Sequence, residues 1–455
     1  MNRIARRAVI TLILALILVS GFSFFLCEYA LNAHKWVVTS GSPHVYNGGN
    51  IGCGVVVDTE GVLLLDMQEG RTYTDDTNLR KSIVHWVGDR YGSVSAPALS
   101  GYSSQLAGFD YLNGVYNYSQ SGGVAKLTLS AQVQKAALEA MGDRKGTVAV
   151  YNYITGEILC AVTTPTFDPD NLPEMTGEAQ EEYEGLYFNR FVQSAYIPGS
   201  IYKIVTLAAA LEDNPEILNQ TFVCNGSYKF GEDEITCEGI HFDQDLKMAF
   251  RNSCNCAFAQ IVEQMGPEKL NKYVEKFRIN ESVKFDHIET AEGNFSVGEG
   301  MDANVAWSGI GQHKDLVNPC AFMTFMGAIA AGGKGVQPHI VENIKVGGAT
   351  TYQARASVSD RLMSESVAQT LQQYLRFNVE DKYGDYHFPD MTVCAKTGTG
   401  EVGGDKKPNA MLTGFVADES LPLAFIVCVE EGGYGSTTCI PIVSKVLATC
   451  KEVLK

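Results

Sequence analysis

An uninterrupted apolar run near the N-terminus is the feature that most restricts what this chain can fold into. Residues 8–26 contain 19 consecutive residues without a charge, close to the length that a helix needs to cross a bilayer. Arg3, Arg6 and Arg7 precede the run, and basic flanks favour the cytoplasmic side of a membrane. We therefore expect a cytoplasmic tail (1–7) followed by a transmembrane anchor.

A cleaved signal peptide is the alternative interpretation of this run, because signal peptides share a basic start and an apolar centre. No small-residue cleavage pattern follows residue 26. The sequence therefore favours a retained anchor. We expect a single-pass protein of the cell membrane, with its N-terminus in the cytoplasm and its larger part extracytoplasmic.

The composition is that of a folded protein. The 455 residues include 45% hydrophobic residues and only 14 prolines, which is enough to bury a large core in two or three structural units. The formal net charge is -17. This charge argues against a nucleic acid partner, since phosphate binding needs clustered Lys and Arg.

Twelve cysteines are spread along the chain, too thinly for a disulfide-stabilised scaffold. Neither a C-x-x-C pair nor a histidine cluster gives the spacing of zinc ligands, so we expect no metal site and no other cofactor. Cys224 and Cys237 bracket a short polar stretch. In an exported region such a pair could close a loop, and a disulfide between them is a hypothesis.

The patterns after the anchor predict an α/β (α+β) fold in two units. Residues 27–122 are rich in Gly, Ser, Tyr and Asn and contain only short strand-like runs, as expected of a small irregular N-terminal domain. Residues 123–455 begin with a helix that Ser130 can cap and Gly142 can end. Two strand-like runs joined by a turn then follow, which predicts a hairpin.

The second unit alternates blocks of strand and helix patterns. Its middle, about 198–335, is largely helical in pattern. Three apolar strand-like runs follow, and Pro441 is expected to begin a closing helix; the runs are 391–398, 409–417 and 421–430. We therefore expect one antiparallel sheet built from distant segments and flanked by helices, with a helical subdomain inserted.

Ser200 lies directly after a Pro-Gly pair, at the expected start of a helix. Backbone N–H groups at a helix start are unpaired and can stabilise negative charge on a substrate oxygen. Lys203 follows one helical turn later, so its amine could take the serine's proton if burial lowers its pKa. An N-cap serine with an ordinary helix lysine is the simpler interpretation of this pair alone.

Two further short motifs occur once each in the chain. Ser253 and Asn255 form the only S-x-N triplet, for which loop or cap roles are the ordinary explanation. Lys396, Thr397, Gly398 and Thr399 follow an apolar run and are expected on a strand. An edge-strand lysine is usually solvated, but the adjacent glycine would let a ligand backbone approach closely.

Taken in order, the three motifs resemble the signature elements of the penicillin-binding protein and serine β-lactamase superfamily. The resemblance covers roughly residues 125–455, because stretches such as TGEILCAVTTPTFDPDN and SGIGQHKDLVNPCAF also look like class B penicillin-binding transpeptidases. It implies a peptidoglycan D,D-transpeptidase domain over 123–455. The implied partners are peptidoglycan stem peptides, β-lactam antibiotics, the cytoplasmic membrane and a membrane glycosyltransferase of the cell-wall machinery.

The resemblance also implies residue roles. Ser200 would attack the D-Ala-D-Ala peptide bond, Lys203 would be the base, and Ser253, supported by Lys396, would relay the proton to the leaving amine. Asn255 would hold the peptide group of the substrate, and Thr397 and Thr399 would meet its terminal carboxylate beside Gly398. The backbone amides of Ser200 and Thr399 would form an oxyanion hole.

Two alternatives remain open at this level. A D,D-carboxypeptidase or β-lactamase carries the same three motifs, but a hydrolase needs a base that activates water. No carboxylate is placed beside Ser200 by its spacing, because Glu212 and Asp213 lie three helical turns along the helix. A carboxylate brought in from elsewhere in the chain stays open. A non-catalytic penicillin sensor or wall-binding scaffold is the other alternative, although sensors usually couple to a long cytoplasmic module.

Overall fold

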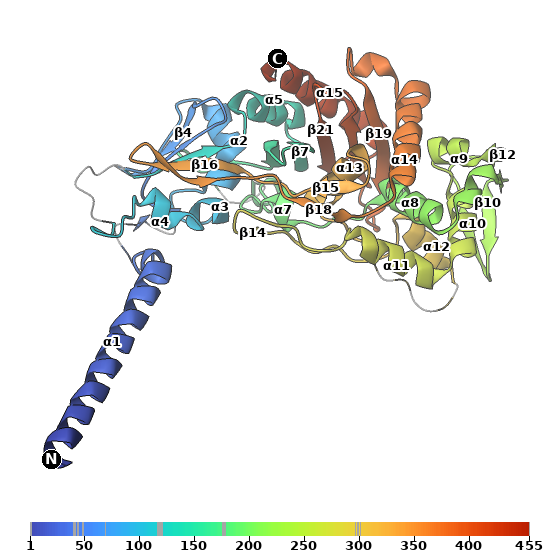
Figure 1. Cartoon of the computed structure of the whole chain (residues 1–455). Helices are drawn as coiled ribbons and strands as arrows, with labels where there is room; N and C mark the ends of the chain where they lie inside the picture. The colour runs from blue at the N-terminus through green and yellow to red at the C-terminus, as the bar shows by residue number, and fades with distance from the viewer. Residues whose placement is uncertain are drawn as a thin grey trace.

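The structure is a computed structural model in which one long helix extends from the rest of the protein (Figure 1). This helix, α1 (Asn2–Trp36), has exposed apolar side chains and is long and apolar enough to cross a membrane. It is longer at both ends than the expected anchor, 8–26, and it fits a single-pass membrane protein. The residues described are 2–39, 42, 45–47, 50–68, 70–115, 122–174, 179–295, 297, 300 and 302–454.

A five-stranded antiparallel sheet with the order β19-β20-β21-β7-β8 forms the centre of the larger part. Every residue of β8, β20 and β21 is buried, because helices cover both faces of the sheet. Helices α5 and α15 pack on one face and α13 on the other. The bounds are β7 (Gly146–Asn152), β8 (Ile158–Thr164), β19 (Val393–Gly400), β20 (Asn409–Val416), β21 (Leu423–Val429), α5 (Ala131–Met141), α13 (Pro319–Ala330) and α15 (Gly435–Val453).

The expected sheet of distant segments is therefore confirmed. The helix expected after Ser130 is also present, and the Ser130 hydroxyl accepts a hydrogen bond from the backbone N–H of Val133 over 3.4 Å. The closing helix was placed wrongly, because it begins at Gly435 and Pro441 lies inside it. Pro441 removes one backbone hydrogen bond and crowds the carbonyl of the preceding turn, and burial of Cys439 and Ile440 keeps this first part of the helix packed on the sheet.

A second, six-stranded sheet joins the N-terminal part to the rest of the chain, with the order β17-β16-β6-β3-β4-β5. Strand β6 pairs in parallel with β3 and antiparallel with β16, so strands from both sides of residue 122 share this sheet. Buried Asp58 adds a link, since its carboxylate accepts from the N–H of Ala131 over 2.9 Å. The bounds are β3 (Val55–Val57), β4 (Leu63–Asp66), β5 (Thr72–Tyr73), β6 (Val124–Leu127), β16 (Val341–Val346), β17 (Ala349–Gln353), α2 (Thr77–Val87), α3 (Pro97–Ser100), α4 (Ser103–Leu106), β1 (Tyr46–Asn47) and β2 (Asn50–Ile51).

The block between the sheet strands is helical where expected, but it also contains short strands between Thr221 and Asp245. The alternating burial of Phe222 and Cys224 along β9 shows the strand period that the sequence analysis missed. The short strands β10 and β12 lie at the end of the molecule away from α1 (Figure 1). The bounds are η1 (Gly199–Tyr202), α8 (Lys203–Asp213), β9 (Thr221–Cys224), β10 (Ser227–Phe230), β11 (Asp233–Thr236), β12 (Phe242–Asp245), α9 (Leu246–Asn252), α10 (Asn255–Met265), α11 (Pro267–Phe277), β13 (Lys284–Phe285), β14 (Ile288–Glu289), α12 (Ala303–Ile310) and α14 (Glu365–Asn378).

The remaining elements are short connections around these layers. One of them, η3, is a single π-helical turn that continues α14 and brings Tyr383 toward β19. The bounds are α6 (Ala179–Glu182), α7 (Arg190–Gln193), η2 (Pro215–Asn219), β15 (Lys334–Val336), β18 (Val358–Arg361), η3 (Val379–Tyr383) and η4 (Asp385–His387).

Three backbone segments meet around the turn that carries Ser200. The N–H of Gly199 donates to the carbonyl of Gly311 over 2.7 Å, and both glycines have positive φ angles, +54° and +89°. A Cβ on Gly199 would lie 2.1 Å from the carbonyl oxygen of Thr399 in β19, and one on Gly311 would lie 2.1 Å from that of Gly199. Only glycine permits this approach.

We predict that Gly311→Ala destabilises the protein strongly. The left-handed backbone costs ~1–2 kcal/mol with a Cβ, and the clash adds ~1–3 kcal/mol of overpacking. Gly347→Ala is the matched control, since Gly347 also has a positive φ, +57°, but open space around its Cβ position. Thermal unfolding should show the larger fall in Tm for Gly311→Ala, and equal falls would contradict this account.

Candidate active site

The hydroxyl of Ser200 and the amine of Lys203 lie one turn apart at the junction of η1 and α8. Lys203 Nζ donates to Ser200 Oγ over 2.9 Å. The lysine is fully buried, and this burial lowers the pKa of its amine to about 8. A buried amine with a lowered pKa can be neutral near physiological pH, so it can accept a proton from the hydroxyl.

Ser253 lies at the C-terminal end of α9 with a left-handed backbone, φ 58° and ψ 38°. Such a conformation is costly for a residue other than glycine and is often found at functional sites. It turns the chain so that Lys203 Nζ reaches both the carbonyl of Ser253, over 2.9 Å, and its hydroxyl, over 3.3 Å. The second serine therefore shares the amine of Lys203 with Ser200.

Lys396 approaches the same serine from the strand β19. Its Nζ donates to Ser253 Oγ over 3.0 Å and to the carbonyl of Thr397 over 3.0 Å. The side chain is buried rather than solvated, although β19 is an edge strand. Burial lowers the pKa of Lys396 well below its ordinary value, and the nearby charge of Lys203 adds a smaller lowering. The two lysines therefore both contact the hydroxyl of Ser253.

The other residues expected at the site also lie around this centre. Asn255 Oδ1 accepts from Lys203 Nζ over 2.7 Å, and Asn255 Nδ2 donates to the carbonyl of Thr236 over 2.9 Å. Thr397, Gly398 and Thr399 line the same cavity along β19. All eight residues expected from the three motifs are thus brought together; they are Ser200, Lys203, Ser253, Asn255, Lys396, Thr397, Gly398 and Thr399.

Two residues that the sequence analysis missed fix β19 beside this centre. The hydroxyl of Tyr383 lies 3.0 Å from Thr397 Oγ1 and accepts from the N–H of Thr397 over 3.2 Å. Gln312 Nε2 donates to the carbonyl of Thr399 over 3.0 Å. Neither residue belongs to the three motifs: Gln312 lies in a stretch noted only for its overall resemblance, and Tyr383 lies in the turn η3 before β19.

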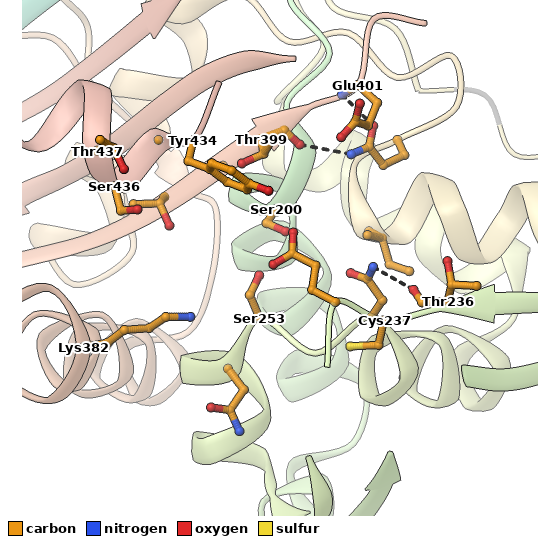
Figure 2. Close-up of a pocket in the computed structure, with 18 of the residues that line it drawn as sticks. Ser200, Thr236, Cys237, Ser253, Lys382, Thr399, Glu401, Tyr434, Ser436 and Thr437 are labelled. Atoms are coloured by element: carbon orange, nitrogen blue, oxygen red, sulfur yellow. Dashed lines mark hydrogen bonds between the residues drawn. The ribbon is translucent and has the colours of Figure 1, made fainter. Parts of the chain in front are cut away.

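The cavity that contains Ser200 and Ser253 has a volume of 1020 Å³ (Figure 2). Glu212 and Asp213 are remote from it and pair with Lys276 and Lys269, as the helical spacing predicts. Two carboxylates from other segments, Glu238 and Glu401, line the cavity.

A cluster of thiols and one imidazole lies directly beside the cavity. The possible ligand atoms of Cys224, Cys237, His241 and Cys254 all lie within 4.8 Å of one another. Cys224 and Cys237 are free thiols and not the disulfide that was hypothesised. Cys254 stands between Ser253 and Asn255, so this cluster also positions the S-x-N turn.

No metal is expected from the sequence, since these residues show no compact ligand spacing. The fold gathers them from three separate segments around β9, β12 and the start of α10. Three thiols and one imidazole are a donor set that structural zinc sites use. The residues present therefore fit a zinc ion, which would hold the loop after β11 against the S-x-N turn.

We predict that the purified full-length protein contains about one zinc ion per chain, as closed four-ligand sites do. Cys224→Ser and His241→Ala should lower the zinc content measured by mass spectrometry and lower Tm, because metal binding contributes to folding stability. Cys160→Ser, a buried thiol in the sheet, is the control. A metal-free protein with a Cys224–Cys237 disulfide in peptide mapping would contradict the prediction.

Comparison with known proteins agrees with this geometry. Residues 146–448 match the model of the penicillin binding protein transpeptidase domain. The chain is 28% identical over 378 residues to peptidoglycan D,D-transpeptidase PbpA of Mycobacterium tuberculosis, covering 75% of each chain. It is 26% identical over 414 residues to stage V sporulation protein D of Bacillus subtilis, covering 86% of this chain and 60% of that protein.

Solved structures show the same fold. Penicillin-binding protein A from M. tuberculosis, in its penicillin G acyl-enzyme complex, superposes with a TM-score of 0.74 at 24% identity over 88% of this chain and 99% of that chain. The family model covers well over half of the 455 residues, and the resemblance seen in the three motifs is confirmed. The chain belongs to the penicillin-binding protein transpeptidase family.

Proposed function

We propose that this protein is a serine-type peptidoglycan D,D-transpeptidase that cross-links stem peptides and is acylated by β-lactams. One observation carries the proposal: the buried amine of Lys203 contacts the hydroxyls of Ser200 and Ser253 together, over 2.9 Å and 3.3 Å. The names of the relatives, peptidoglycan D,D-transpeptidases of mycobacteria among them, support the same activity.

In the first half-reaction Ser200 Oγ forms a bond to the carbonyl carbon of the donor peptide. Lys203 takes the hydroxyl proton, a role that its lowered pKa supports. Ser253 passes a proton to the leaving D-alanine amine, and Lys396 orients Ser253 through its contact with Oγ. The backbone N–H groups of Ser200 and Thr399 stabilise the oxyanion.

The cavity wall supplies the substrate contacts. Asn255 holds the peptide group of the donor stem, while the hydroxyls of Thr397 and Thr399 receive its terminal carboxylate. Gly398 leaves room for the backbone of the substrate. This half of the reaction needs no cofactor.

We place the catalytic domain outside the cytoplasm, with α1 as the membrane anchor. The three arginines at the start of α1 support this orientation. We also propose a membrane glycosyltransferase as partner, since cross-linking requires glycan strands that the family's transpeptidase domain does not polymerise. A solved complex joins the penicillin-binding protein PBP2 of Helicobacter pylori with MreC, which supports assembly with other proteins.

A fluorescent penicillin tests the function and the topology together. The full-length protein should form a covalent adduct that Ser200→Ala abolishes and that persists for many minutes, because an acyl-transferase must protect its ester from water. Protease added to intact spheroplasts should remove the labelled domain. Rapid, repeated turnover of a chromogenic cephalosporin would favour the hydrolase alternative, and a protected domain would refute the orientation.

Acylation should depend on pH through Lys203. The neutral amine is the base, so the acylation rate should rise as pH increases through about 8 and then level off. Lys203→Arg keeps the charge but cannot deprotonate, and it should slow acylation by about 10²–10⁴-fold. Lys382→Arg, the same change at a cavity lysine, is the control. A parent-like rate in Lys203→Arg would exclude this base.

A further inference from the structure

Glu238 is a carboxylate of the active-site cavity to which the reaction described above gives no role. It lies in the loop between β11 and β12, and its exposed side chain lines the cavity together with Ser200 and Ser253. Among the residues that the structure describes, no hydrogen bond or ion pair engages this carboxylate. Its charge is therefore available to a ligand in the cavity.

The loop that carries Glu238 is held on both sides of this residue. The carbonyl of Thr236 accepts from Asn255, and the N–H of Cys237 donates to Gly226 over 2.9 Å. On the other side, the N–H of His241 donates to the carbonyl of Cys224 over 3.2 Å. Cys237 also contacts Cys254 in the thiol cluster, with the sulfurs 3.9 Å apart. Figure 2 shows Cys237 at the cavity wall facing the region of Ser200 and Ser253.

The electrostatic surroundings of Glu238 are mostly positive. Its charge raises the pKa values of Lys203, Lys396 and Lys382, opposing the larger lowering by burial. Lys203 and Lys396 form the catalytic centre, and Lys382 lines the cavity wall. Any of these amines that carries a proton repels an incoming cation, and the charge of Glu238 opposes that repulsion.

The second half-reaction requires such a cation to enter. An alkyl amine has an ordinary pKa near 10.4, so the acceptor amine of a second stem peptide arrives as an ammonium ion. Water carries no charge and needs no such partner. A carboxylate at the cavity wall would therefore favour the amine over water at the acyl-enzyme.

We propose that Glu238 binds the ammonium group of the acceptor stem peptide and so directs the acyl group to an amine. This inference rests on the proposed transpeptidase function. The bound ammonium first loses one proton to solvent. Its nitrogen then forms the bond to the acyl carbon, the ester bond to Ser200 Oγ breaks, and Lys203 transfers a second amine proton to Oγ. The products are the amide cross-link and free Ser200.

The test measures how one acyl-enzyme divides between amine and water. The full-length protein is acylated with a D-alanyl thioester in the presence of Nα-acetyl-L-lysinamide, whose ε-amine is its single cation. Glu238→Gln keeps the shape and removes the charge. Glu401→Gln is the matched control, because Glu401 lines the same cavity. Amide and acid products are quantified separately over a range of amine concentrations and ionic strengths.

Glu238→Gln should raise the amine concentration for half-maximal amide formation by tenfold or more, and the ratio of amide to acid product at a given amine concentration should fall. Glu401→Gln should keep the parent value, and added salt should weaken amine use by the parent more than by Glu238→Gln. An unchanged half-saturating concentration or equal effects of both variants would overturn the proposal. A parent that forms no acyl-enzyme would instead refute the proposed function.

Discussion

The active site depends on two amines that are buried without a carboxylate partner. Removing a charged amine from water is costly unless hydrogen bonds replace its hydration or the amine becomes neutral. Lys203 finds hydroxyl, carbonyl and amide oxygens around its Nζ, and Lys396 finds a hydroxyl and a carbonyl. Burial keeps water away from the amine of Lys203 and lowers its pKa, so the amine can be neutral and accept the proton of Ser200.

This arrangement requires a rigid frame, and close backbone contacts provide it. The turn before Ser200, the strand β19 and the end of α12 meet at glycines that leave no space for a side chain. Tyr383 and Gln312 then fix β19 through its backbone and Thr397. The hydroxyl of Ser200 and the substrate-binding strand are therefore parts of one packed unit, in which a small backbone shift would disturb both.

Much of this site could be predicted from the sequence, because each motif keeps its residues within a few positions of one another. Ser200 and Lys203 share a helical turn, and the Lys396 segment follows an apolar strand pattern. Tyr383, Gln312 and Glu238 could not be found in this way, since none belongs to a motif and only the folded chain brings them to the cavity. The metal-ligand cluster was missed for the same reason, and the strands between Thr221 and Asp245 were too short for a clear period.

The six-stranded sheet has a consequence for how the protein can be divided. Strand β6 lies between β3 and β16, so a fragment beginning at residue 123 would keep β6 but lose its neighbour β3. The bare edge would present unpaired N–H and C=O groups along β6, a surface on which chains aggregate. A soluble fragment for crystallisation should therefore start before Val55, although the family match begins only at residue 146.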